Sequence, residues 1–391
     1  MNDPRFVRNV LLKGLSLFIV VNVLFAFTNP LPALGWVSAY NLLFPGRVRL
    51  PYGERPDLAY NLSLFSLDAM FASHDIARGP KPADEFRVVL IGDSSTWGYL
   101  LHPQDTLCAL LNDRGLVTPG GRQVRFYNLG YPTLSLTKDL LLLSRAMQYK
   151  PDLIIWLVTL ESFPVNNQLA AALAQHNPQA VRELIAAGNL RLDANSAEFV
   201  NPTRWDQTII GQRRAVADWF RLQLYGVLWA ATGIDQYYPP KYPPPERDLS
   251  AEKSFYGQEP PTLNESGLSF DVLEAGVKLA GDVPMLLINE PIYRSDGQNS
   301  DIRYNFFYPR WIYDQYRQAM SAHAQSNGWL YLDLWDLVPA PEFSNSAIHL
   351  TPQGEILVAA QIEQMILPVI ADTEHPADTE HPAEMTKSSE R

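Results

Sequence analysis

The sequence predicts an α/β fold, in which a parallel sheet lies in a three-layer α/β/α sandwich. Short, strongly apolar runs of strand length alternate along the chain with stretches that have the apolar spacing of helices. This alternation is typical of parallel strands whose connecting helices cover both faces of a sheet. Because 47% of the 391 residues are hydrophobic, the chain can bury a core of the size that such a fold needs.

The first element in the chain is an apolar segment near the N-terminus. Residues 10–27 contain few polar side chains. The length of this segment is close to the lower limit of the roughly 17–25 residues of a membrane-spanning helix. Arg5, Arg8 and Lys13 lie on its N-terminal side, so the positive-inside rule predicts a cytoplasmic N-terminus and an extracytoplasmic remainder. A cleaved signal peptide is the alternative, but residues 28–32 contain no clear small-x-small cleavage site. We expect a single-pass membrane anchor.

The next elements are the strands and helices of the predicted sandwich. Five runs have the character of strands, at residues 86–91, 124–128, 152–158, 284–289 and 329–334. Residues 136–149 have the spacing of an amphipathic helix, which would connect the second strand to the third.

The connection between the third and fourth strands is far longer than a crossover needs, which predicts an insert of about residues 163–275. Within it, residues 167–188, divided at Pro178, and residues 204–231 look helical, and the Pro-rich residues 237–245 look extended. The insert is a lid over an acceptor site, a docking surface for a partner, or only a decorated crossover.

The remaining segments are a stalk and a polar tail. The expected organisation is a cytoplasmic N-terminus at 1–9, an anchor at 10–28, a stalk or extension at 29–85, an α/β domain at 86–368 and a disordered tail at 369–391. A net charge of −11 without a dense Lys/Arg stripe argues against a nucleic-acid partner. The lone Cys108 can form no intramolecular disulfide, and the absence of a Gly-rich phosphate loop or a Cys/His cluster implies neither cofactor nor metal.

The strongest functional signal is a serine at the end of the first predicted strand. Gly92, Asp93 and Ser94 follow that strand and precede a predicted helix, whose unpaired N–H groups favour developing negative charge. Nucleophilic serines of acyl transfer occupy such turns. Far downstream, His349 stands just before another predicted helix and provides a candidate base. A serine nucleophile needs a base of this kind within hydrogen-bond reach.

With Gly92-Asp93-Ser94, Asn128-Leu129-Gly130 and His349 in this order, the chain resembles the SGNH, or GDSL-like, hydrolase family of esterases and acyltransferases over roughly residues 86–368. The resemblance implies that Ser94 is the nucleophile and His349 the base, and that the backbone N–H groups of Ser94 and Gly130 bind the oxyanion. It also implies that the site lies at the carboxyl ends of the strands.

One departure from the family pattern concerns the third oxyanion donor. Glu161 stands near the place of the asparagine that supplies this donor in the family, and an ionised carboxylate there would repel the oxyanion. Candidate replacements are Asn166, Asn167 and Asn289, of which we favour Asn289 because it ends a predicted strand. Glu161 and Asp93 are also candidates for modulating the site.

A second departure concerns the group that orients the histidine. The family usually has an aspartate three residues before the histidine, and here that residue is Ser346. Asn345, Ser346 or a backbone carbonyl can accept a hydrogen bond from the imidazole of His349, and Asp333 or Asp336 can take the same place.

Two functions from different classes follow. The resemblance and the anchor predict a membrane-anchored, extracytoplasmic serine esterase or O-acyltransferase that acts on ester-linked acyl groups, with cell-envelope glycan or lipid as candidate substrates. Acyl transfer to water would make it a hydrolase, and transfer to a sugar hydroxyl a transferase. The alternative is a catalytically degenerate domain that binds envelope polymer or a membrane partner. Glu161 and the missing aspartate favour this alternative, whereas Ser94, Gly130 and His349 together oppose it.

Overall fold

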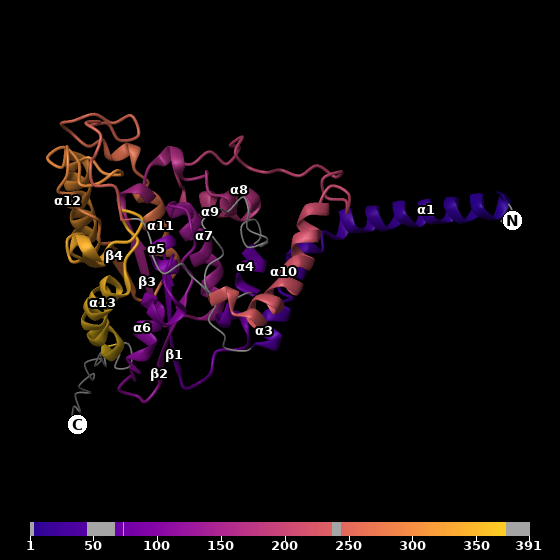
Figure 1. The fold of residues 1–391 in the computed structure, drawn as a ribbon, viewed down its shortest axis with the longest axis horizontal. Helices are drawn as coiled ribbons and strands as arrows, with labels where there is room; N and C mark the ends of the chain where they lie inside the picture. The colour runs from indigo at the N-terminus through magenta and orange to yellow at the C-terminus, as the bar shows by residue number, and fades with distance from the viewer. Residues whose placement is uncertain (1–3, 45–66, 73, 237–243, 373–391) are drawn as a thin grey trace, which may run out of the picture.

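The computed structural model describes residues 4–44, 67–72, 74–236 and 244–372 (Figure 1). At its centre is a five-stranded sheet in the order β2-β1-β3-β4-β5, and every neighbouring pair is parallel. The strands are β1 (Glu85–Ile91), β2 (Gln123–Asn128), β3 (Leu153–Val158), β4 (Met285–Asn289) and β5 (Leu330–Asp333). Each of the five strands predicted from the sequence is confirmed, within one or two residues at its ends.

The strand order reverses at β1. Strand β2 pairs with one edge of β1, with Leu90 opposite Asn128, and β3 pairs with the other edge, with Ile91 opposite Trp156. In open α/β sheets, ligands bind at the carboxyl ends of the strands where the order reverses. The end of β1 is therefore the place at which a site is expected.

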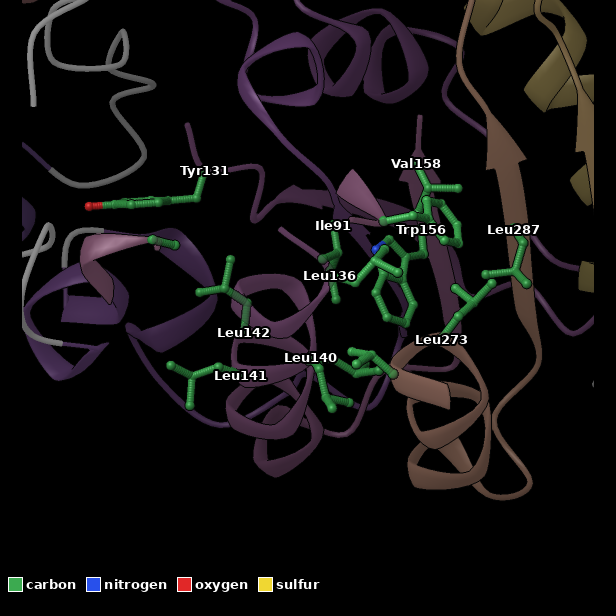
Figure 2. Close-up of a cluster of buried hydrophobic side chains, with 14 of the residues drawn as sticks. Ile91, Tyr131, Leu136, Leu140, Leu141, Leu142, Trp156, Val158, Leu273 and Leu287 are labelled. Atoms are coloured by element: carbon green, nitrogen blue, oxygen red, sulfur yellow. The ribbon is translucent and has the colours of Figure 1, made fainter. Parts of the chain in front are cut away.

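Helices cover both faces of the sheet, which confirms the predicted three-layer fold class. One face carries α7 (Leu136–Ala146), α11 (Phe270–Ala280) and α12 (Arg310–Asn327), and the other carries α6 (Leu107–Asp113) and α13 (Pro352–Asp372). Figure 2 shows part of the first core, in which Trp156 of β3 lies between leucines of α7 and α11. The alternate residues of β3, Ile155 and Leu157, face the second core. Strand β3 at the centre of the sheet is buried on both faces, and all six of its residues are apolar.

In its described part, the insert between β3 and β4 contains three α-helices before α11, namely α8 (Ala172–His176), α9 (Pro178–Gly188) and α10 (Arg213–Thr232). Pro178 occupies the first turn of α9, as the predicted division requires. Helix α10 begins later than residue 204, since residues 204–212 form turns. Most of the Pro-rich segment, residues 237–243, lies outside the described residues. Short 3-10 helices lie at Asp75–Ala77, Pro103–Asp105, Met147–Tyr149, Leu160–Ser162, Val165–Asn167, Ile234–Gln236, Glu265–Gly267 and Ala340–Glu342.

The apolar N-terminal segment forms the helix α1 (Pro4–Thr28), which projects away from the α/β domain (Figure 1). Among the described residues, α1 and α13 are the helices long and apolar enough to cross a membrane. Helix α13, however, buries Val358, Ile362 and Ile366 in the second core, as a core helix does. Most apolar side chains of α1 are exposed, whereas one face of α13 is covered by the rest of the α/β domain.

The predicted stalk contains the short helices α2 (Leu31–Leu34), α3 (Ala39–Leu43) and α4 (Leu67–Ala72), while residues 45–66 lie outside the described residues. At the other end of the domain, α13 continues past the predicted boundary at residue 368 to Asp372, because Ile370 is buried in the second core. Residues 369–372 of the tail predicted at 369–391 therefore belong to α13, and residues 373–391 lie outside the described residues.

Candidate active site

Ser94 begins the turn that follows β1. The carboxylate of Asp93 caps this turn, because its Oδ1 accepts a hydrogen bond from the Ser95 N–H at 2.7 Å. The helix α5 (Ser94–Trp97) is only one turn long and ends at Gly98, whose φ of 84° is in the left-handed region that glycine tolerates. The helix predicted after the first strand is thus a single turn, and the capped turn itself positions the serine.

His349 lies in the connection between β5 and α13 and reaches the serine. The Ser344 N–H donates to the His349 carbonyl at 2.8 Å, and Phe343 pairs with Leu350. These contacts join the two ends of the loop of residues 344–349 and fix the backbone of His349. The Ser94 Oγ lies 2.8 Å from the His349 Nε2, although 255 residues separate them in sequence. The fold thus brings together the two residues that the sequence proposed as nucleophile and base.

Asn345 completes a chain of three side chains. Its Oδ1 lies 2.9 Å from the Nδ1 of His349, and an amide oxygen can only accept. The imidazole therefore carries its proton on Nδ1, which leaves Nε2 to accept the hydroxyl proton of Ser94. Burial lowers the pKa of His349 to about 4, so the imidazole is neutral at physiological pH. Of the orienting groups considered, Asn345 takes the position; Ser346 is half-buried beside it.

Gly130 follows β2 and packs directly against the turn of Ser94. A Cβ at residue 130 would lie 2.5 Å from the backbone nitrogen of Trp97 and 2.8 Å from the carbonyl carbon of Thr96, so only glycine fits. The Gly130 N–H donates to the Asn128 Oδ1 at 2.9 Å, and the Asn128 Nδ2 donates to the Trp97 carbonyl at 3.2 Å. Asn128, whose side chain the sequence interpretation did not use, therefore holds the proposed oxyanion donor against the serine turn.

A buried lysine joins the two loops that carry Ser94 and Gly130. The Nζ of Lys138 donates to the Gly92 carbonyl at 2.7 Å and to the Tyr131 carbonyl at 2.9 Å, and it pairs with the carboxylate of Asp139. Lys138 is fully buried in α7. Sequence reasoning missed this residue, because a lysine in the first turns of an amphipathic helix is usually solvated.

Glu161 follows β3, and its carboxylate accepts a hydrogen bond from the hydroxyl of Tyr256, a residue of the insert. Burial raises the pKa of Glu161 to about 7, against the smaller opposing effects of the Tyr256 hydroxyl and the Arg303 guanidinium. Tyr256 itself lies in a tight turn at a positive φ of 48°, in which Phe255 pairs with Gln258. The insert thus supplies a specific partner for the Glu161 carboxylate.

The amide of Asn289, which the sequence favoured as the third oxyanion donor, is bonded to other side chains, and the structure does not support this prediction. Its Nδ2 donates to Asp333 at 2.8 Å and to Tyr313 at 3.3 Å, and its Oδ1 accepts from Tyr316 at 3.3 Å. The side chain is fully buried on the α12 face of the sheet. Asp333 is committed as well, since it accepts hydrogen bonds from Asn289 and Arg317.

Further carboxyl groups are buried behind the serine turn. Burial raises the pKa of Asp93 to about 7, and the nearby Glu290 has a pKa well above its usual range for the same reason. Thr96 of α5 donates to Glu290 at 3.4 Å. Burial also raises the pKa of Glu355 in α13, to about 8. Among these carboxyl groups, Asp93 is the one that caps the turn of Ser94, through its hydrogen bond from the Ser95 N–H.

The fold and the site together define an α/β protein with a Ser-His-Asn chain at the carboxyl edge of its sheet. Within the described ranges, no three His, Cys, Asp or Glu side chains are grouped as a metal site. No family model and no curated protein matched the chain.

Similar solved structures include several esterases. The carbohydrate acetylesterase Est24 from Sinorhizobium meliloti is 12% identical, with 72% of this chain and 99% of that chain covered and a TM-score of 0.35. The aryl esterase of M. smegmatis is 12% identical, with 71% and 99% covered and a TM-score of 0.33. A G-D-S-L family protein from Desulfitobacterium hafniense is 14% identical, with 72% and 99% covered and a TM-score of 0.31.

Proposed function

We propose that this chain is a membrane-anchored serine esterase or O-acyltransferase of the SGNH type, whose catalytic domain lies outside the cytoplasm. The observation that carries the proposal is the hydrogen-bonded chain of Ser94, His349 and Asn345 at the end of β1. A serine hydroxyl with a neutral imidazole 2.8 Å away is arranged for nucleophilic attack on an acyl carbonyl.

The geometry supports a two-step acyl transfer. In the first step the Ser94 Oγ bonds to the acyl carbon while His349 Nε2 takes the hydroxyl proton, and the imidazolium then gives this proton to the departing alcohol oxygen. In the second step water or an acceptor hydroxyl attacks the acyl-Ser94 ester and loses its proton to His349, which returns a proton to the departing Ser94 oxygen. The first acceptor yields a carboxylic acid and the second yields a new ester.

The oxyanion of each tetrahedral intermediate needs preorganised donors. We assign these to the backbone N–H groups of Ser94 and Gly130. The Gly130 N–H already donates to Asn128, so the oxyanion would replace the Asn128 carbonyl as its acceptor. The third donor of the family is replaced by the Glu161 carboxyl, which can donate only while it is protonated.

The apolar helix α1 supports the anchored location. Its exposed apolar side chains need a lipid environment, and Arg5 and Arg8 near its start favour a cytoplasmic N-terminus. A domain held outside the membrane in this way meets cell-envelope glycan and lipid, which we propose as the source of the acyl esters and of the acceptor hydroxyl.

A second candidate is a degenerate domain that binds such polymers without turnover. It is favoured by two observations: Asn345 brings no charge to stabilise the imidazolium, and the Gly130 N–H has an acceptor within the protein.

Labelling with a fluorophosphonate probe separates the two candidates. The full chain in detergent micelles is compared with Ser94→Ala and His349→Ala, after circular dichroism has shown that all three are folded. Labelling of the wild type that both substitutions abolish supports the serine enzyme. A folded wild type that takes up no probe supports the binding domain. For a labelled protein, release of acid or of a new ester from an aryl acetate, with and without a sugar acceptor, separates hydrolase from transferase.

A further inference from the structure

Helix α10 exposes a continuous apolar stripe. Phe220, Leu224 and Leu228 recur every four residues, and their exposed fractions are 62%, 60% and 49%. Side chains with this spacing lie on one face of a helix. A row of large apolar side chains on a soluble surface usually marks an interaction site.

The opposite face of α10 is already fixed to the segment that follows α1. The Trp219 Nε1 donates to the Leu34 carbonyl at 2.7 Å, and the Gln223 Oε1 accepts from the Ala39 N–H at 2.7 Å. Gly226 lets the helix approach the side chain of Tyr40. Because these contacts hold the inner face, the stripe cannot turn toward the sheet and stays on the outside.

The beginning of α10 lies next to the end of α1. The Ile210 N–H donates to the Asn22 Oδ1 at 3.3 Å, and the Arg204 guanidinium lies 5.3 Å from the centre of the Phe27 ring. In Figure 1, α10 starts at the inner end of α1 and runs away from it at an angle to its axis. If α1 crosses a bilayer, α10 starts at the level where the bilayer surface lies.

The surroundings of α10 suit the boundary of a bilayer. Arg213 and Arg214 in its first turn are exposed, as are Trp205 just before it and Leu42 of the adjoining α3. Arginine and tryptophan favour the headgroup level, and a helix with a broad apolar face can bury that face at the boundary of the acyl chains.

We propose that α10 is an interfacial helix whose face of Phe220, Leu224 and Leu228 is buried in lipid. This inference rests on the proposed anchoring by α1. It assigns a role to the insert: together with α2 and α3, α10 forms a platform that holds the α/β domain in one orientation on the membrane.

Fluorescent labels at single cysteines test the proposal on the full chain, because Cys108 is the only natural cysteine and can be replaced by alanine. An environment-sensitive nitrobenzoxadiazole label is placed at Leu224→Cys, and the protein is reconstituted into vesicles of phosphatidylcholine and phosphatidylglycerol. Lipids with a spin label on the acyl chain serve as quenchers, near its headgroup end for the label at residue 224 and near its methyl end for the label at residue 15. Matched labels are placed at Asp218→Cys on the polar side of α10, at Gln364→Cys in α13 and at Leu15→Cys within α1.

We expect at least about twofold quenching of the labels at residues 224 and 15, and little at residues 218 and 364. Quenching at residue 15 without quenching at residue 224 overturns the interfacial helix and leaves the anchor intact. Emission at residue 224 that depends on protein concentration but not on the quencher would identify a second copy of the chain as the occupant, which also overturns it. Lack of quenching at residue 15 removes the anchor and the inference with it.

Discussion

At the scale of the residue, the base of this site is tuned by burial and by one neutral partner. Burial lowers the pKa of His349 to about 4, while Asn345 fixes its tautomer without adding charge. A neutral imidazole has a free nitrogen lone pair and can accept a proton. The low pKa, however, reduces the driving force for the transfer of that proton. Because a negative charge at residue 345 would raise the pKa of His349, we expect the rate of acyl transfer to depend on that charge.

Asn345→Asp tests this dependence. The wild type keeps a neutral imidazole down to low pH, so its kcat/KM for an aryl ester should fall only as the pH drops through about 4. An aspartate would favour the imidazolium and raise the pKa of His349, so the acid limb should move to higher pH. Asn345→Ala should instead lower kcat/KM by about 10²-fold through loss of orientation. Profiles of kcat/KM against pH measure both, and an unmoved acid limb in Asn345→Asp would contradict the assignment of Asn345.

The raised pKa of Glu161 predicts a second limb, at alkaline pH, in the profile of kcat/KM against pH. Its pKa is raised to about 7, so its ionised fraction grows above neutral pH, and the carboxylate would then repel an oxyanion at the site. We expect kcat/KM to fall as the pH rises through about 7 in the wild type and to stay level in Glu161→Gln.

Tyr256→Phe serves as the control for this limb. The hydrogen bond from Tyr256 lowers the pKa of Glu161, so its loss should move the fall in kcat/KM to higher pH. An alkaline limb that persists unchanged in Glu161→Gln would show that another group causes it.

At the scale of the element, the site depends on how closely the β1 and β2 loops approach. A Cβ on Gly130 would meet the backbone of Thr96 and Trp97, which cannot move aside as a flexible side chain can. Gly130→Ala should therefore displace the serine turn, lower the rate of fluorophosphonate labelling by at least about 10-fold and destabilise the fold by about 1–3 kcal/mol. Gly79→Ala, where a Cβ meets nothing within 4 Å, is the matched control and should change neither quantity. Equal behaviour of the two variants would refute the packing argument.

Lys138 of α7 connects the same two loops, because its Nζ donates to the Gly92 and Tyr131 carbonyls. Lys138→Met removes both bonds and leaves the carboxylate of Asp139 buried without its partner, which should cost about 3–5 kcal/mol in urea unfolding. Lys138→Met combined with Asp139→Asn should recover part of this loss, because the uncompensated charge is gone. The exposed Lys278→Met is the control. A single variant as stable as the control would mean that the ion pair is not needed.

At the scale of the whole molecule, the N-terminus and the α/β domain should lie on opposite sides of a membrane that α1 crosses. A cysteine at residue 278, in a chain with Cys108→Ala, should react with a membrane-impermeant maleimide in intact cells that express the full chain. A cysteine at residue 2 should react only after the cells are permeabilised, because the positively charged N-terminus stays in the cytoplasm. The opposite pattern of labelling would reverse the proposed topology.

The sequence by itself was sufficient for the strands, the fold class and the pairing of Ser94 with His349. Apolar runs bounded by turns encode strands locally, and parallel strands end at the same edge of a sheet, so residues that follow two strands can be expected to meet. The crossover helix α7 and the division at Pro178 are confirmed for the same reason, because spacing and proline act within a few residues of the chain.

Only the tertiary structure decided which neighbouring side chain served each role. Asn345 and Ser346 were both within reach of His349 in sequence, but only the closed loop placed the amide oxygen against Nδ1. Asn289 ended a strand as expected, yet its amide donates to Tyr313 of α12 and Asp333 of β5. The contacts of Lys138 and α10 likewise join segments far apart in the chain. Hydrogen-bond partners depend on distances of a few tenths of an ångström, which the fold sets and a sequence pattern does not.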